Sequence, residues 1–162
     1  MDPTRLKIVV FGSFHAGKST FIQAIDPGSR HVDAECADGT TTIALDFGRA
    51  EIDGRVIHLY GTPGQERFEF VRQIISSGMD GAVLMVDCSC GVDAFTRYLY
   101  QQLKEMGVPL SVMLNKCDLS GACPAVVQQE LDGAATCHIS ARDPESSREA
   151  LEQFVRTIEK KR

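Results

Sequence analysis

Eight consecutive residues near the start of the chain have the residue types and the spacing needed to hold phosphate groups. They run from Gly12 to Ser19 and read Gly-Ser-Phe-His-Ala-Gly-Lys-Ser, a complete G-x-x-x-x-G-K-S pattern. The glycines allow the backbone to curl so that its N–H groups face phosphate oxygens, and a following helix adds its positive N-terminus. Lys18 is expected to reach the β- and γ-phosphates, and the Ser19 hydroxyl to ligate Mg²⁺. We interpret this segment as a phosphate loop, called the P-loop below.

A second motif, Asn-Lys-Cys-Asp at residues 115–118, has groups that recognise a guanine base. The carboxylate of Asp118 can accept hydrogen bonds from guanine N1–H and the N2 amino group, which adenine cannot offer. Asn115 would connect this base loop to the P-loop, and the aliphatic part of Lys116 would cover one face of the base. A third segment, Ser-Ala-Arg at residues 140–142, would place the N–H of Ala141 on guanine O6.

Short apolar runs that alternate with amphipathic stretches must position these motifs. Strands are predicted at Leu6–Phe11, Thr41–Phe47, Arg55–Tyr60, Gly81–Asp87, Leu110–Asn115 and Thr136–Ser140. Asp53-Gly54 is typical of a tight turn, so it predicts an antiparallel hairpin. The other strands are separated by helical segments, which predicts a mostly parallel sheet covered on both faces. Ligands bind such folds beyond the carboxyl ends of the strands, which is where the motifs lie.

Length and composition predict one globular domain spanning residues 1–162. The chain is 43% hydrophobic and 24% charged, close to the average for globular proteins. Its 17 Lys and Arg against 22 Asp and Glu give a net charge of −5, so no broad nucleic-acid surface is expected. The segment from about Pro27 to Thr41 is the one long loop expected, and a loop of that length is usually functional.

Cysteine usage and the chain ends predict a cytoplasmic protein without a direct membrane anchor. A chain of this length and hydrophobicity does not need disulfides, so its six cysteines are expected to be reduced. Cys88-Ser89-Cys90 could form half of a metal site, but no second pair has matching spacing. No secretory signal and no stretch near 18 apolar residues is present, and Asp2 stands where myristoylation requires glycine.

The chain contains in order a P-loop, an Asn-Lys-x-Asp base loop and a final Ser-Ala segment. In this it resembles the Ras-like small GTPases over essentially its full length. The resemblance implies the fold of a P-loop NTPase G domain. This α/β fold has a six-stranded, mostly parallel sheet with one antiparallel strand and helices on both faces. It also implies a monomeric molecular switch with GTP or GDP and Mg²⁺ as cofactors, in which two loops are ordered by GTP and released on hydrolysis.

The two switch loops are assigned from the same resemblance. Thr40–Phe47 looks like the first switch, in which Thr42, or Thr41 as the alternative, would contact Mg²⁺ and the γ-phosphate. Gly61–Glu66 looks like the second switch, where the N–H of Gly64 would meet the γ-phosphate and Gln65 would orient the attacking water. The catalytic residues implied are Gln65, Lys18 and Thr42, and the metal ligands Ser19 and Thr42. The nucleotide-binding residues are Gly12, His15, Ala16, Gly17, Lys18, Ser19, Thr20, Gly64, Asn115, Lys116, Asp118, Ser140, Ala141 and Arg142.

The second switch departs from the family pattern, which begins with an aspartate that supports Mg²⁺. Gly61 stands there, so Asp46 or Asp53 would have to supply a carboxylate from elsewhere. The stretch His58–Gln65 resembles instead the prokaryotic branch that includes the bacterial cell-polarity and gliding-motility GTPases. That branch also lacks the aspartate, and its activating partners are roadblock-type proteins.

A second departure concerns the arginine that can assist hydrolysis. Relatives in that branch carry one just before the first-switch threonine, whereas this chain has Thr41, and Arg30 is the candidate substitute. Without such a residue, hydrolysis in this class runs at about 10⁻⁴ per second and a partner raises it by about 10⁵. We therefore expect a slow enzyme with effector surfaces at Leu45–Arg49 and Glu66–Ile74, the latter including Phe68 and Phe70 as candidate partner contacts.

Two other functions are compatible with parts of the pattern. A module that binds GTP or GDP without hydrolysing it would explain Gly61 but not Gln65. A P-loop kinase would need an arginine-bearing lid, whereas the loop before Thr41 holds only Arg30, and a kinase would leave Asn115 and Asp118 unexplained.

Overall fold

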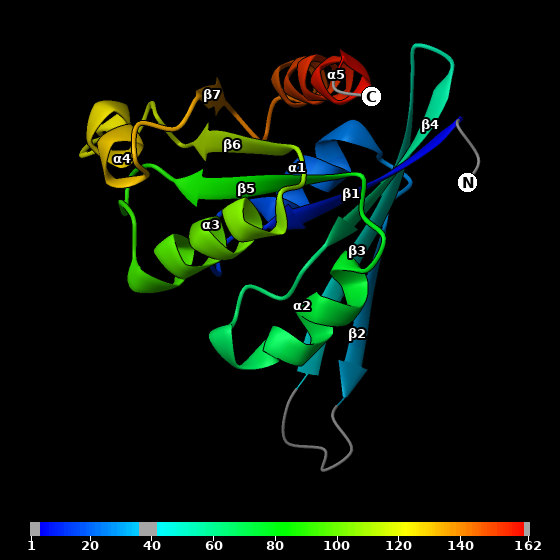
Figure 1. Ribbon diagram of the computed structural model, residues 1–162, viewed down its shortest axis with the longest axis horizontal. Coiled ribbons are helices and arrows are strands. Elements are labelled where there is room, and N and C mark those ends of the chain that lie inside the picture. Colours follow the sequence, from blue (N-terminus) through cyan, green and yellow to red (C-terminus); the bar gives the residue numbers. More distant parts are fainter. Residues whose placement is uncertain (1–3, 36–41, 161–162) are drawn as a thin grey trace.

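The computed structural model describes residues 4–35 and 42–160. In chain order the elements are β1 (Arg5–Phe11), α1 (Lys18–Ile25), β2 (Arg30–Glu35), β3 (Thr42–Ile52), β4 (Arg55–Gly61), the 3₁₀ turn η1 (Glu66–Phe68), α2 (Glu69–Ser76), β5 (Gly81–Asp87), α3 (Ala94–Met106), β6 (Leu110–Asn115), α4 (Pro124–Glu130), β7 (Thr136–Ile139) and α5 (Pro144–Lys160). Within these ranges the strands form one sheet in the order β2-β3-β4-β1-β5-β6-β7 (Figure 1).

Strand directions confirm the predicted α/β architecture. The strands β4, β1, β5, β6 and β7 pair in parallel, whereas β3 runs antiparallel to both of its neighbours, β2 and β4. The hairpin between β3 and β4 turns at Asp53 and Gly54, which both have positive φ angles, 49° and 78°. This two-residue turn sets Ile52 opposite Arg55 and thereby the register of the whole hairpin.

The prediction of six strands was wrong, because the segment expected to be one long loop contains β2. This strand pairs with β3 from Arg30, opposite Phe47, to Glu35, opposite Thr42. Its sequence, Arg-His-Val-Asp-Ala-Glu, has no apolar run, because it lies at the edge of the sheet and its first four residues are exposed. Backbone pairing with β3, and not burial of apolar side chains, therefore forms this strand.

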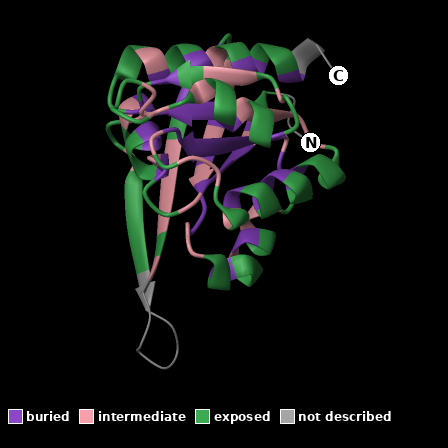
Figure 2. Ribbon diagram, turned by 90° about the vertical axis from the view of Figure 1, so that its left-hand side faces the viewer, coloured by how far each residue is buried: buried purple, intermediate pink, exposed green. Residues whose placement is uncertain are grey.

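Helices cover both faces of the sheet and bury its apolar side chains. On one face, α1 and α5 pack on β1, β4 and β5 through Phe21, Ile22, Leu151 and Phe154. On the other face, α3 and α4 pack on β5 and β6 through a second cluster. Figure 2 shows the buried residues on the central strands and on the inward sides of the helices. The central strands are thus held rigidly, which fixes the positions of the loops at their carboxyl ends.

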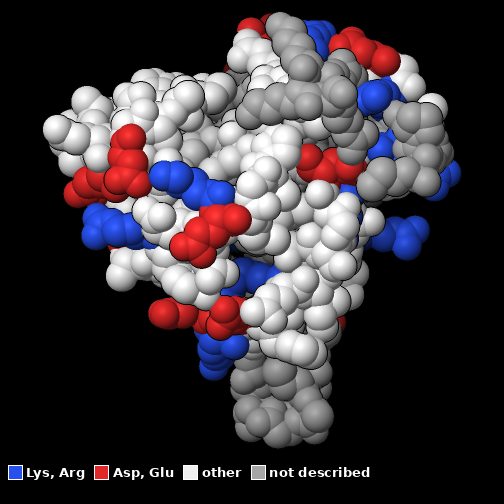
Figure 3. Space-filling model, viewed as in Figure 1, with Lys and Arg blue, Asp and Glu red and all other residues white. Residues whose placement is uncertain are grey.

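The described residues can also be characterised by their surface charge, their cysteines and the nature of their helices. On the face shown in Figure 3, acidic and basic side chains are interspersed. Cys88, Cys90, Cys117, Cys123 and Cys137 are free thiols, and Cys36 lies outside the described residues. Among the helices of the described ranges, none combines the length and the apolar character needed to cross a membrane.

We predict that Phe154→Ala destabilises the domain through the α5 face of the core. Phe154 is 5% exposed and packs so closely over the start of β5 that a Cβ at Gly81 would lie 3.0 Å from its ring. Removing the ring should lower the free energy of unfolding by about 3–5 kcal/mol. Urea unfolding at one saturating GDP concentration measures the change. Gln153→Ala, at the exposed neighbouring position, should stay within about 0.5 kcal/mol of the parent.

Candidate functional site

A cavity of about 670 Å³ opens beyond the carboxyl ends of the central strands, a size suited to a nucleotide. It brings together nearly all the site residues predicted from the sequence. Its lining includes His15, Gly17, Lys18, Ser19, Thr20, Gly64, Gln65, Asn115, Lys116, Asp118, Ser140, Ala141 and Arg142. The P-loop, the second switch, the base loop and the final segment all contribute residues to this lining. The predicted motifs therefore form one site.

The P-loop is held in a tight curl by its own backbone and by Lys18. Gly17 has a φ of 100°, and a Cβ there would collide with the side-chain amide of Asn115, so only glycine fits. The ammonium of Lys18 donates to the carbonyl oxygens of Gly12 and Ser13, both at 2.8 Å. Burial lowers the pKa of Lys18 from 10.5 to about 8, an effect that the negative charge of Asp46 opposes. Lys18 is therefore a buried cation at neutral pH, as phosphate binding requires.

The side chain of Asn115 connects three loops. Its Nδ2 donates to the carbonyl of Ala16 at 3.1 Å, and its Oδ1 accepts from the N–H groups of Lys116 and Ala141, both at 3.0 Å. This confirms the expected link between the base loop and the P-loop and adds the final segment to it. The N–H of Ala141 is the group that we expected on guanine O6. That contact stays a prediction, and it requires this N–H to be shared with Asn115.

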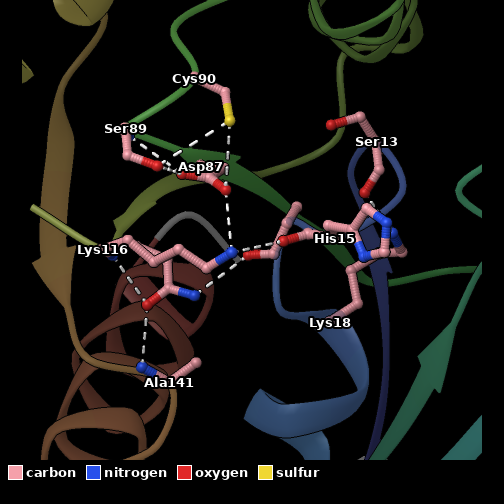
Figure 4. Close-up of polar contacts among 10 residues, drawn as sticks. Ser13, His15, Lys18, Asp87, Ser89, Cys90, Lys116 and Ala141 are labelled. Atoms are coloured by element: carbon pink, nitrogen blue, oxygen red, sulfur yellow. Dashed lines mark hydrogen bonds and ion pairs between the residues drawn. The ribbon is translucent and has the colours of Figure 1, made fainter. Parts of the chain in front are cut away.

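Lys116 is held by an acidic residue that the sequence analysis did not select. Its ammonium lies 2.9 Å from Asp87 Oδ2 and donates to the carbonyl of His15 at 3.0 Å, so it bridges the end of β5 and the P-loop (Figure 4). Burial tends to raise the pKa of Asp87, but hydrogen bonds from Ser89 and Lys116 outweigh it and leave the pKa lowered. Asp87 is thus ionised at neutral pH and fixes the ammonium of Lys116 beside the P-loop. As the last residue of a predicted strand, it could have been found by the rule that found Asn115.

The second switch contacts the P-loop directly. Thr62 is buried and donates from both its N–H and its hydroxyl to the carbonyl of Val10. The N–H of Phe14 in the P-loop donates to the carbonyl of Gly64 at 3.0 Å. Gln65 lines the cavity, and its side-chain oxygen accepts from Arg67 Nε at 3.0 Å. Gly64 and Gln65 therefore lie beside the P-loop and Lys18, and their contacts with the γ-phosphate and the attacking water stay predictions.

Arg72 of α2 holds the second switch in this position. Its guanidinium donates to the carbonyls of Gln65 and Glu66 at 2.6 and 2.9 Å and lies over the ring of Phe95. Burial lowers its pKa, with nearby acidic groups acting in the opposite direction. The sequence does not reveal this role of Arg72, because an arginine within an amphipathic helix has no pattern that distinguishes it from a solvated side chain.

Ser19 contacts a carboxylate from β3. Its hydroxyl donates to Asp46 Oδ2 at 2.6 Å, and the other carboxylate oxygen of Asp46 lies 2.7 Å from Nδ1 of His31. This hydrogen bond raises the pKa of His31. Hydroxyl and carboxylate oxygens are ligands that Mg²⁺ prefers, so the donor set around Ser19 fits that ion.

Five other residues were singled out from the sequence, and the structure describes the positions of only some of their side chains. Thr42 begins β3 with its side chain outside the described part, and Thr41 lies outside it entirely, so the first-switch assignment stays a prediction. Arg30 is exposed at the start of β2 and is not among the described residues that line the cavity. Phe68 is buried and lines the cavity, whereas Phe70 is 72% exposed.

Comparison with known proteins agrees with this geometry. Residues 4–159 match the family model of the elongation factor Tu GTP binding domain. The chain belongs to this family. As a GTP-binding domain it has the α/β P-loop GTPase fold, in a seven-stranded form within the described residues.

Individual relatives cover different shares of this GTP-binding domain. The uncharacterized protein MJ1339 of Methanocaldococcus jannaschii is 33% identical over 119 residues, which are 74% of this chain and 75% of that protein. Peptide chain release factor 3 of Streptococcus gordonii is 33% identical over 82 residues, but these are 51% of this chain and only 16% of the factor. A solved structure of the small GTPase Arl6 (BBS3) of Trypanosoma brucei with bound GppNp has the same fold, with a TM-score of 0.72 at 18% identity over 97% of this chain and 99% of that one.

We predict that Asn115→Ala weakens both folding and nucleotide binding. The change leaves the buried carbonyl of Ala16 and two N–H groups without this partner, and should lower the free energy of unfolding by about 2–4 kcal/mol. The affinity for GDP should fall at least tenfold, because the three loops lose their common link. Urea unfolding and fluorescence titration measure the two effects. Gln101→Ala removes a surface amide that contacts Asp132, and it should change neither. Equal behaviour of the two variants would contradict the role of Asn115.

Proposed function

We propose that this domain is a molecular switch that binds GTP or GDP and hydrolyses GTP slowly on its own. The observation that carries the proposal is the convergence of Lys18, Gln65 and Asp118 on one cavity. Lys18 offers a positive charge for phosphates, Gln65 an amide for orienting water, and Asp118 a carboxylate for guanine. A site that only held a phosphate would need neither Gln65 nor Asp118.

Each residue has a definite part in the proposed reaction. The P-loop N–H groups and Lys18 bind the β- and γ-phosphates and neutralise the charge that develops as the terminal phosphate leaves. The amide of Gln65 orients water for in-line attack, which requires its side chain to leave Arg67. When bound, Mg²⁺ supplies further positive charge to the same phosphate oxygens. Ser19 would hold it, and Thr42 is the second ligand that the resemblance implies.

Slow hydrolysis follows from the arginines near the site. Among the described residues that line the cavity, Arg142 is the only arginine, and it lies in the final segment with the base-recognition residues. Among the described residues, the guanidinium groups that hydrogen-bond to Gln65 are those of Arg67 and Arg72, and both bind oxygens of the switch itself. A partner that supplies positive charge would raise the rate. A roadblock-type activating protein is the partner class that the resemblance implies, acting on a cytoplasmic, monomeric switch.

The exposed surface of the second switch is the proposed contact for such partners. Phe70 and Ile74 are 72% and 58% exposed on α2, within the segment Glu66–Ile74 expected to bind effectors. Phe68 is buried and lines the cavity instead. The partner surface thus has Phe70, and not Phe68, as its aromatic contact.

A module that binds GTP or GDP without hydrolysing it is the second candidate. Two observations favour it: Gly61 replaces the acidic residue of the switch, and the side-chain oxygen of Gln65 is bonded to Arg67. A glutamine held in this way would not orient water.

Gln65→Leu separates the two candidates. If Gln65 positions water, the rate of phosphate release from GTP in a single turnover should fall by about 10- to 100-fold while GDP affinity stays within twofold. Stoichiometric γ-labelled GTP, with ATP in parallel, measures the rate. Gln73→Leu, further along α2, is the matched control and should hydrolyse GTP like the parent. An unchanged rate in Gln65→Leu would support the non-hydrolysing module.

Asp118→Asn tests whether guanine is the base. An asparagine amide cannot accept from both N1–H and the N2 amino group, but it can donate to the O2 of xanthine. The affinity for GDP should fall at least 100-fold and that for xanthosine diphosphate should rise. Competition titration with both nucleotides measures the preference. If both affinities stayed unchanged, the base would not be read at Asp118.

A further inference from the structure

We propose that Asp46 supplies from β3 the carboxylate that the second switch lacks at position 61, and that it supports Ser19 and the Mg²⁺ of the bound nucleotide. This inference rests on the proposed function, because it concerns the ion that would accompany GTP or GDP. It assigns to a residue outside the switch motif a task that Gly61 cannot perform.

The strand register brings Asp46 to the place that a side chain at position 61 would otherwise fill. Asp46 and Gly61 are directly opposite each other in the β3–β4 pair. Residues directly opposite on neighbouring strands project from the same face of a sheet. The carboxylate of Asp46 therefore approaches the end of β4 on the face where a side chain of residue 61 would lie.

Packing around Gly61 shows that the two positions share one space. A Cβ at Gly61 would lie 3.1 Å from the Cβ of Asp46, 3.3 Å from its Oδ2 and 3.1 Å from Ile22 Cδ1. Such distances are tighter than ordinary van der Waals contact, and a longer side chain would need still more room. The absence of a side chain at position 61 is therefore what allows the carboxylate of Asp46 to sit there.

The carboxylate reaches the residue at which Mg²⁺ is expected. Asp46 Oδ2 accepts from the Ser19 hydroxyl at 2.6 Å, and Asp46 lines the same cavity as Lys18 and Ser19. Its side chain is only 14% exposed. A half-enclosed carboxylate beside a hydroxyl ligand can bind Mg²⁺ directly or through one of the waters that this ion keeps.

Asp53, the other acidic candidate from the sequence, is excluded by its position. It lies in the turn at the far end of the same hairpin, where it is 48% exposed and contacts Arg156 of α5 at 3.0 Å. It is not among the residues that line the cavity. Asp53 therefore serves as a matched control for the removal of a carboxylate from this hairpin.

A competing explanation is that Asp46 only fixes β2 to β3. Its Oδ1 lies 2.7 Å from His31 Nδ1, and His31 also contacts Asp33 at 3.1 Å. The two explanations use different oxygens, because Oδ1 faces the edge strand and Oδ2 faces Ser19. They can be separated by removing His31.

The test measures how the release of a fluorescent GDP analogue depends on Mg²⁺. In the parent protein, release should accelerate at least tenfold when the ion is chelated. In Asp46→Asn, which keeps an oxygen near Ser19 but removes the charge, the Mg²⁺ concentration that half-restores slow release should rise at least tenfold. The double variant Asp46→Ala/Gly61→Asp returns a carboxylate to the site from β4, and it should recover most of this loss relative to Asp46→Ala.

Two control variants separate a loss of Mg²⁺ support from the loss of another carboxylate or of the contact between β2 and β3. Asp53→Asn and His31→Gln should keep the Mg²⁺ requirement of the parent within about twofold. A Mg²⁺ requirement in Asp46→Asn equal to the parent's would overturn the inference, as would a His31→Gln variant that matched Asp46→Asn. Circular dichroism of each variant excludes unfolding as the cause, and the double variant tests the carboxylate even if Asp46→Ala alone folds poorly. Release of GDP from the parent that ignored Mg²⁺, or no GDP binding at all, would count against the proposed function itself.

Discussion

The buried amide of Asn115 is the interaction on which the arrangement of the site depends. One side chain at the end of β6 satisfies a carbonyl of the P-loop and N–H groups of the base loop and the final segment. These loops follow three different strands, and the rigid parallel sheet alone would bring them near one another without fixing their distances. The ends of β1, β6 and β7 therefore act as one unit, and a nucleotide would meet a preformed surface.

Burial of the charged Lys18 side chain in the site destabilises the folded protein. Lowering the pKa of Lys18 from 10.5 to about 8 corresponds to about 3 kcal/mol against its charged form in the folded protein. This is the net cost, in which the negative charge of Asp46 already offsets part of the desolvation of the ammonium. An anion bound beside Lys18 would offset more, so binding of nucleotide and stability of the fold are coupled through this one ammonium.

The features that could be predicted from the sequence are those that leave a pattern of residue types along the chain. Gly81–Asp87 and Leu110–Asn115 were predicted with their observed bounds, because strands buried on both faces are continuous apolar runs. The edge strand β2 was missed, since backbone pairing with β3 leaves no hydrophobic pattern. Arg72 acts through backbone oxygens seven and six residues before it, a geometry that only the folded switch creates. The choice between Asp46 and Asp53, by contrast, was available: a two-residue turn at Asp53-Gly54 already implies a register with Asp46 opposite Gly61.

The shared space at positions 46 and 61 has a consequence for how such sequences diverge. Because the side chain of Asp46 occupies the room beside Gly61, the two positions form a steric pair, and the effect of a substitution at one depends on the residue at the other. A lineage that changed one position first would pass through a crowded intermediate or through one with no carboxylate. Homologous chains should therefore fall into two discrete classes, with the carboxylate at either position 46 or position 61. A sequence profile that scored these two alignment columns independently would misjudge both classes.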